Sequence, residues 1–157
     1  MIMPHLGSFQ SFEIMLSPAL SMQDMLDRGN YQGVSSGLLA STIGVFDGEG
    51  KRRVSLVPLG KTCTGEEAIA ALKEMGYKSL ALQALLVVGM THPQEQMTAP
   101  IAALGWKGFY TIEEDGEKHV HPAYPCLAAD GNSHRAVNLH DVNHVWGPNV
   151  RFLVEEI

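Results

Sequence analysis

Five histidines and two aspartates lie close together in the C-terminal part of the chain. They are His119, His121, Asp130, His134, His140, Asp141 and His144. Imidazole nitrogens and carboxylate oxygens are ligands that zinc accepts. Residues two apart on a strand point to the same face, so His119 and His121 could act together, with His140 as a third ligand. These residues raise the hypothesis of a zinc-dependent hydrolase.

The same histidines also fit a structural interpretation. No HExxH or CxxC motif fixes the geometry of a metal site. Polar residues are expected at alternating positions on the solvent-facing side of an antiparallel sheet. The metal site at His119, His121 and His140 is therefore the alternative hypothesis, and zinc is the one cofactor that the sequence suggests.

Aromatic and polar residues of the same region predict a ligand-binding surface. An aromatic wall with a few polar groups is typical of small-molecule sites. The candidates are Trp106, Tyr110, Tyr124, Arg135, Asn138 and Asp141. Alternatively, the aromatic residues belong to the core or form cross-strand pairs. We expect Trp146 and Phe152 in the core, and we expect Arg151 to find a carboxylate or carbonyl partner.

Two further motifs favour structural roles. Gly60-Lys61-Thr62 precedes a helix, but Ser55 stands where a phosphate-binding loop needs a glycine. Cys63 lies before the same helix, where a dipole can lower a thiol pKa, yet cysteine is commonly a small buried residue. Cys63 and Cys126 have no metal or redox spacing, which fits a reducing compartment.

Composition indicates one globular domain and argues against nucleic-acid binding. The 157 residues are 45% hydrophobic and 18% charged, which is enough for a core within a single domain spanning residues 1–157. The net charge of −6 would repel a phosphate backbone. The apolar stretch at residues 80–90 covers about half a membrane span, and the N-terminus lacks the pattern of a secretory signal. We therefore expect a soluble, cytoplasmic protein.

The N-terminal part, residues 1–60, is expected to contain a strand and a short helix. Residues 9–16 alternate as a strand does, with one apolar face made of Phe12, Ile14 and Leu16. Ser21 can cap the helix, and Gly29 can end it.

A hairpin and an apolar surface are also predicted there. Residues 42–46 and 53–59 look extended around a turn at 47–50, and Pro58 indicates a strand end or an edge. Several methionines suggest an adaptable apolar surface that could contact a partner subunit. They are Met1, Met3, Met15, Met22 and Met25.

The middle part, residues 61–92, predicts a helix pair. Thr64 and Glu67 form a capping box, and Gly76 provides a left-handed stop. The second helix, at residues 80–88, is almost entirely apolar and is therefore expected to be buried.

The boundaries of that second helix are also predicted. Ser79 is its expected cap, and Gly89 is its expected end.

The C-terminal part, residues 100–157, is rich in strands. Turn residues separate five short β-leaning runs at 101–106, 108–112, 118–127, 135–140 and 150–155. Helices followed by a run of strands predict an α+β fold, with the helix pair packed on a mostly antiparallel sheet.

Three sequence pieces carry a resemblance to known proteins: GEEAIAALKEMGYKSLALQALLVVG, PIAALG, and Trp146 followed after four residues by RFLVEE. Residues 54–157 resemble a family of small bacterial proteins without an assigned activity. The order of parts also resembles the C-type-lectin-like fold. The lectin disulfides and calcium motifs are absent from this chain, so that resemblance implies no sugar binding.

The sequence therefore favours a non-catalytic ligand- or protein-binding domain that uses its C-terminal strands and loops. The first alternative is the zinc-dependent hydrolase. The second is a structural subunit of a homo-oligomer that uses the methionine-rich N-terminal segment. A protein or small-molecule partner is expected, and neither nucleic acid nor a membrane is.

Overall fold

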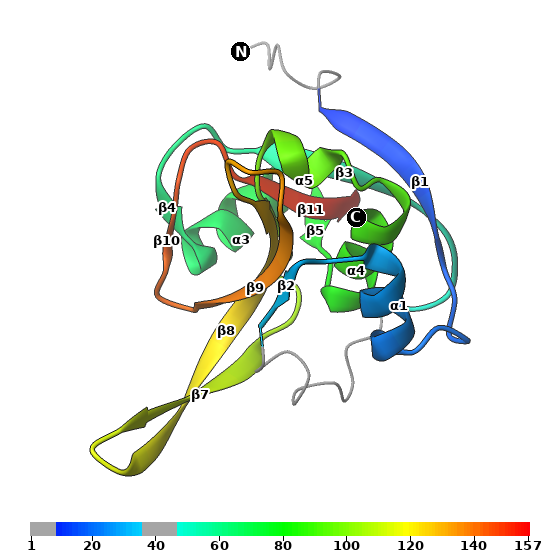
Figure 1. Cartoon of the computed structure of the whole chain (residues 1–157). Helices are drawn as coiled ribbons and strands as arrows, with labels where there is room; N and C mark the ends of the chain where they lie inside the picture. The colour runs from blue at the N-terminus through cyan, green and yellow to red at the C-terminus, as the bar shows by residue number, and fades with distance from the viewer. Residues whose placement is uncertain (1–8, 36–46) are drawn as a thin grey trace.

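The computed structural model describes residues 9–35 and 47–157, and it has the α+β fold that the sequence predicts (Figure 1). The strands are β1 (Gln10–Leu16), β2 (Gly33–Val34), β3 (Gly50–Pro58), β4 (Cys63–Thr64), β5 (Tyr77–Ser79), β6 (Ile101–Ala102), β7 (Gly108–Glu114), β8 (Glu117–Ala129), β9 (Arg135–Asp141), β10 (Val145–Trp146) and β11 (Arg151–Glu156). The helices are α1 (Met22–Gly29), α3 (Gly65–Glu74), α4 (Leu82–Thr91) and α5 (Glu95–Thr98).

Strand β11 joins distant parts of the chain within one mixed sheet. It pairs antiparallel with β3 and β5, and parallel with β6. From β11 the sheet continues through β3 to β1 on one side, and through β6, β8 and β9 to β2 on the other. Most pairs among the described strands are antiparallel, which confirms the predicted character of the sheet.

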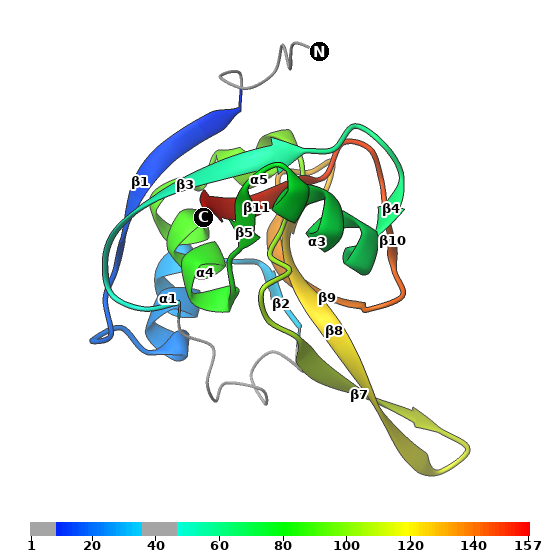
Figure 2. The same cartoon turned by 180° about the vertical axis from the view of Figure 1, so that it is seen from behind.

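The two faces of the sheet carry separate hydrophobic clusters. Along β11, Leu153 packs into the cluster that contains α1 and α4, whereas Phe152 and Val154 belong to the cluster that contains α3. This alternation follows the two-residue period of a strand. The two predicted helices therefore cover opposite faces of the sheet, and Figure 2 shows α3 and α4 on either side of β11.

The predicted helix starts at Ser21 and Thr64 are confirmed. The Ser21 hydroxyl accepts a hydrogen bond from the Asp24 amide at 3.0 Å, and the Asp24 carboxylate accepts one from the Ser21 amide at 3.1 Å. Thr64 and Glu67 exchange the same pair of bonds at 3.2 and 2.9 Å. Such boxes satisfy amides that a helix start leaves without partners.

The end of α1 differs from the prediction by one residue. The left-handed position is Asn30, with φ 52°, and Gly29 is still helical. A Cβ at Gly29 would collide with the ring of Tyr31. Glycine is thus required there by a neighbouring side chain and does not serve as the helix stop.

The predicted boundaries of the second helix are wrong. Ser79 lies in β5, where it pairs with Val154, and the helix starts at Leu82. The carboxylate of Asp47, which is remote in sequence, accepts hydrogen bonds from the amides of Ala81 and Ala84 at this helix start. The helix also continues through Gly89 to Thr91. Gly89 does not end the helix but leaves room for Tyr31, since a Cβ there would collide with the Tyr31 hydroxyl oxygen.

The predicted N-terminal strand is confirmed, with Ile14 and Leu16 buried on one face. The extended segment predicted at residues 42–46 lies outside the described residues. Its expected return strand is β3, which ends at Pro58 as predicted. No helix among the described residues is both long and apolar enough to cross a membrane.

The N-terminal methionines divide between the core and the surface. Met22 and Met25 are buried in the cluster that contains α1 and α4, whereas Met15 is exposed. Met1 and Met3 lie outside the described residues.

Candidate functional site

The C-terminal histidines are distributed over separate places of the structure. His119 lies on β8 near the end of the β7–β8 hairpin, 3.8 Å from the Glu117 carboxylate. His134 lies in the turn after β8, where its Nδ1 is 3.1 Å from the Asp130 carboxylate. Across residues 9–35 and 47–157, no three His, Cys, Asp or Glu side chains are placed to hold a metal ion together. The structure therefore does not assemble the predicted site of His119, His121 and His140.

His140 instead belongs to an aromatic group. Its ring stacks on His144 with centroids 4.4 Å apart, and both rings meet Trp146 edge-on at 5.3 and 4.6 Å. Trp146 in turn contacts Phe152, and both are buried, as predicted. Burial is the main cause that lowers the pKa of His140, and the charge of His144 is the second. This group packs the segment between β9 and β11 against the α3 side of the core.

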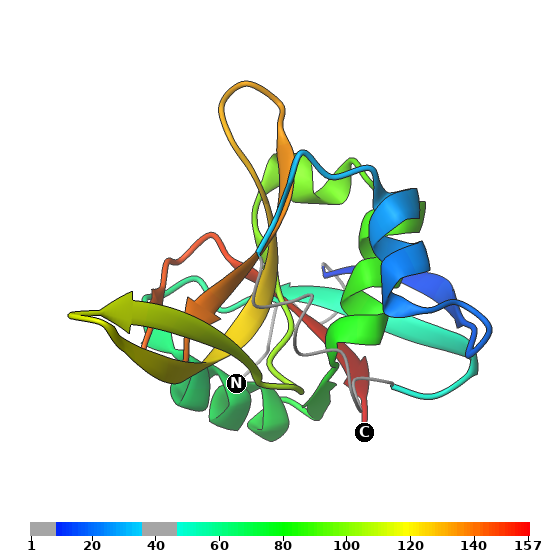
Figure 3. The same cartoon turned by 60° about the horizontal axis from the view of Figure 1, so that its bottom comes forward.

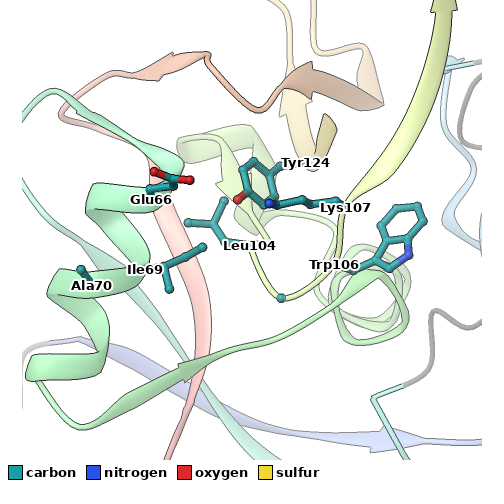
Figure 4. A pocket seen from close by; sticks show the side chains of 8 residues that line it. Glu66, Ile69, Ala70, Leu104, Trp106, Lys107 and Tyr124 are labelled. Carbon is teal, nitrogen blue, oxygen red and sulfur yellow. The ribbon is translucent and has the colours of Figure 1, made fainter. Parts of the chain in front are cut away.

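Two of the predicted ligand residues meet at an open pocket between α3 and β8, here named the α3–β8 pocket (Figure 4). Its volume is about 600 Å³. The pocket is lined by Glu66, Ile69, Ala70, Leu104, Gly105, Trp106, Lys107 and Tyr124. The residues come from the first turns of α3, the segment that follows β6, and β8.

The ring of Tyr124 forms one wall of the α3–β8 pocket and is held by α3. It lies so close to the backbone of Gly65 that a Cβ there would be 2.5 Å from a ring carbon. The Lys107 ammonium lies 5.9 Å from the centre of the ring. Burial is the main cause that raises the pKa of Tyr124, and the nearby charge of Glu66 is the second. The phenol is therefore neutral at physiological pH and can donate or accept a hydrogen bond.

Trp106 contributes less to the α3–β8 pocket than the sequence suggests. Its indole is directed away from Glu66, Ile69 and Ala70 in Figure 4. It packs against the cluster that contains α1 and α4, on the other side of the sheet from Leu104 and Tyr124. The apolar walls of the pocket are thus Ile69, Leu104 and Tyr124.

The other predicted ligand residues lie elsewhere. Arg135 and Asn138 line a second, smaller pocket of about 360 Å³ beside β2 and the turn after β8. The Asp141 carboxylate is 3.7 Å from Nδ1 of His121. Tyr110 pairs with His121 in the β7–β8 ladder, and its side chain lies outside the described residues. The six residues therefore do not form one site.

The guanidinium of Arg135 makes contacts within the fold. Its Nη atoms donate to the carbonyl oxygens of Gly29 and Gly89, the latter at 2.6 Å, and to Oε1 of Gln96 at 2.9 Å. Gly29 and Gly89 lie in the last turns of α1 and α4, where carbonyl groups lack helical partners and the dipole is negative. Arg135 thus joins two helix ends.

Arg151 also has the partners that the sequence predicts. It donates to the Glu95 carboxylate at 3.0 Å, to the carbonyl of Glu95 and to the carbonyl of Ala99 at 2.9 Å. It therefore fixes α5 and the following segment to β11.

Neither cysteine has the properties of a nucleophile. Cys63 and Cys126 are free thiols and both are buried. Burial raises the pKa of Cys63 and raises that of Cys126 to about 12. Both are therefore protonated at neutral pH, and the structural interpretation of Cys63 agrees with its burial and with its pairing opposite Trp146 in the β4–β10 ladder.

Sequence reasoning did not identify Lys107, Leu104 and Ile69 as candidates. Leu104 and Ile69 carry no signal in the sequence beyond that of ordinary core positions. Lys107 follows Trp106 directly, and a cation next to an aromatic residue before a strand could have been a signal for it.

The chain matches no family model, and comparisons with curated proteins and with solved structures also gave no match. The resemblances to a bacterial family and to the C-type-lectin-like fold therefore remain predictions.

Proposed function

We propose that this chain is a non-catalytic binding domain, and that the α3–β8 pocket takes up a small amphipathic anion. The observation that carries the proposal is the combination of apolar walls from Ile69, Leu104 and Tyr124 with the ammonium group of Lys107 at the rim. Its volume of about 600 Å³ lies in the range of roughly 300–1,000 Å³ that is usual for ligand pockets.

Of the two charged residues that line the pocket, Lys107 and Glu66, Lys107 is the one that can hold an anion with an apolar body. Lys107 stands beside the Tyr124 ring and can pair with a carboxylate. Glu66 also lies at the rim, but as an acidic residue in the first turn of α3 it interacts favourably with the helix dipole. The apolar part of the ligand would contact Ile69 and Leu104.

The surroundings of the cysteines and histidines also support a binding function over a catalytic one. The two thiols are buried and protonated, as their raised pKa values require. His140 and His144 stack on each other, and the described parts of the chain place no three metal-ligating side chains together. For these reasons we favour binding over the zinc-dependent hydrolase.

The proposal is tested by titrating ¹⁵N-labelled protein with 3-phenylpropionate while amide chemical shifts are recorded. We expect shifts centred on residues 66–70 and 104–107, with weaker shifts for the cation 2-phenylethylamine. Lys107→Met should weaken binding of the anion several-fold. Lys118→Met, a matched loss of an exposed lysine on β8 outside the pocket, should leave it unchanged.

The proposal fails if neither probe moves these amides, or if Lys107→Met and Lys118→Met alter binding of the anion equally. Ile69→Asn provides a second check, since it places a polar group in the apolar wall and should also weaken binding.

A further inference from the structure

The β7–β8 hairpin extends beyond the rest of the molecule as a two-stranded arm (Figures 1, 2 and 3). All residues from Glu113 to Val120 are exposed, and Val120 is among the most exposed large hydrophobic side chains, at 63%. Among the described strands β7 pairs with β8 alone. An isolated pair of strands has marginal stability in water, so an arm of this kind gains from a further partner strand.

The outer edge of β7 can be assigned from the turn of the arm. Asp115 and Gly116 have φ values of 52° and 80°, which is the conformation of a two-residue type I′ hairpin turn. The flanking pair, Glu114 and Glu117, therefore exchanges both backbone hydrogen bonds, and every second pair along the ladder does the same.

The residues of β7 that lie between these hydrogen-bonded pairs direct their N–H and C=O groups away from β8, to the outer edge of β7. These residues are Phe109, Thr111 and Glu113. Pro122 lies opposite Phe109, and since proline has no N–H, it fits a position where no hydrogen bond between the two strands is made. The outer edge of β7 thus presents a row of backbone donors and acceptors that can accept another strand.

We propose that β7 is a dimerisation strand, and that two copies of this chain pair antiparallel along this edge with Thr111 of each copy facing Thr111 of the other. In this register, residues whose backbone groups face outward are opposite each other in the two copies. Thr111 is opposite Thr111, and Phe109 of each copy is opposite Glu113 of the other. It forms the same contact on both copies, as a two-fold symmetric interface requires.

The charge pattern of the segment selects the antiparallel direction. Lys107 precedes β7, whereas Glu113, Glu114 and Asp115 stand at its far end. Antiparallel pairing about Thr111 places Lys107 of each copy opposite Asp115 of the other. Parallel pairing would instead place the acidic ends together, and like charges directly opposite are destabilising.

The sequence of β7 also suits strand pairing. Its centre, Phe109-Tyr110-Thr111-Ile112, is aromatic and β-branched, which are the residue types enriched in strands. Because the contact consists mainly of two seven-residue strands, it is smaller than a permanent interface, and the dimer should dissociate on dilution.

Sedimentation velocity over a wide range of protein concentration tests the proposal, together with the variant Thr111→Pro and a pair of cysteine variants. The wild-type chain should pass from monomer to dimer. Thr111→Pro removes an outward-facing N–H that β8 does not use, so it should give a monomer whose circular dichroism is unchanged.

Cysteine variants give an independent readout, because both native thiols are buried. In the proposed register the two Thr111 Cα atoms are about 5.5 Å apart, so Thr111→Cys should form a disulfide-linked dimer under mild oxidation. Val120→Cys, directly opposite on β8, would be separated from its counterpart by roughly 14 Å, or three strand spacings, and should not form one.

Three results would overturn the proposal: a wild-type chain that stays monomeric at every concentration, a dimer that persists in Thr111→Pro, or equal cross-linking of Thr111→Cys and Val120→Cys. If Thr111→Pro loses its fold, the cysteine pair decides.

Discussion

The guanidinium carbon of Arg135 lies 4.8 Å from the centre of the Tyr31 ring. The same group donates hydrogen bonds to the last turns of α1 and α4, so β9 is connected to two helices through one side chain. Burial raises the pKa of Tyr31 to about 12, so the ring beside the cation remains a neutral phenol.

Replacement of Arg135 should therefore destabilise the fold. Arg135→Met keeps much of the side-chain volume but leaves the carbonyls of Gly29 and Gly89 without their donor. We expect a loss of about 2–4 kcal/mol in the free energy of unfolding, measured with urea, since buried acceptors without partners are costly. A double-mutant cycle with Gln96→Ala should show coupling, because Gln96 accepts from the same guanidinium. Strict additivity would contradict this role.

Removal of the Asp47 carboxylate should destabilise the start of α4. That carboxylate accepts hydrogen bonds from the amides of Ala81 and Ala84 at 2.7 and 2.9 Å, and the Asp47 amide donates to Gln83 at 2.6 Å. Asp47→Ala should reduce the free energy of unfolding by about 1–2 kcal/mol, as loss of a helix cap does. Hydrogen exchange should also accelerate in the first turn of α4.

Asp27→Ala is the matched control for that change, because Asp27 is exposed and its carboxylate accepts from Gln23 on the same helix. We expect it to alter the free energy of unfolding by less than about 0.5 kcal/mol. Equal effects of the two substitutions would show that Asp47 does not act as a cap.

The His140–His144 stack should make stability depend on pH. Burial, followed by the charge of His144, lowers the pKa of His140 in the folded chain below its ordinary value of 6.5. The folded state therefore favours the neutral ring, and the stabilisation is present above pH 6.5 and lost as the pH falls through the lowered pKa. Thermal unfolding between pH 8 and pH 5 should show this loss.

His144→Phe separates the two causes of the lowered pKa. It keeps an aromatic ring on His140 but removes the charge, so the pKa of His140, followed by NMR, should rise and yet stay below its ordinary value, since burial is the larger cause. His119→Phe, on the arm, should not change it. A pKa unaffected by His144→Phe would contradict the contribution of that charge.

Gly65→Ala should destabilise the chain although alanine is the better helix former. The added Cβ would stand 2.5 Å from a carbon of the Tyr124 ring, and we expect a cost of about 1–3 kcal/mol, as for other overpacked sites. Gly131→Ala, at a position with open space, should be close to neutral in the same urea titration. Tyr124→Leu should reduce the cost of Gly65→Ala, and no such rescue would argue against the contact.

Some parts of this structure could be read from short stretches of sequence. The capping boxes at Ser21 and Thr64 are each completed within four residues, so the sequence alone contains both donors and both acceptors. The strand ending at Leu16 was predictable because alternation of apolar residues reflects burial of one face. The need of Arg151 for an acceptor was also predictable, although its identity as Glu95 was not.

Tertiary structure decided the rest, because the remaining contacts join residues far apart in the chain. Asp47 replaces a local cap for α4 from 34 residues away, and nothing near Ser79 reveals it. The histidines are close in sequence, but their strand and turn positions do not gather them at one site: His140 stacks on His144, whereas His119 and His134 each lie near a carboxylate. Tyr124, Ile69 and Lys107 form one pocket only because β8 and α3 pack together. Local hydrogen bonding and periodicity determined the elements, whereas the long-range packing of those elements determined the site.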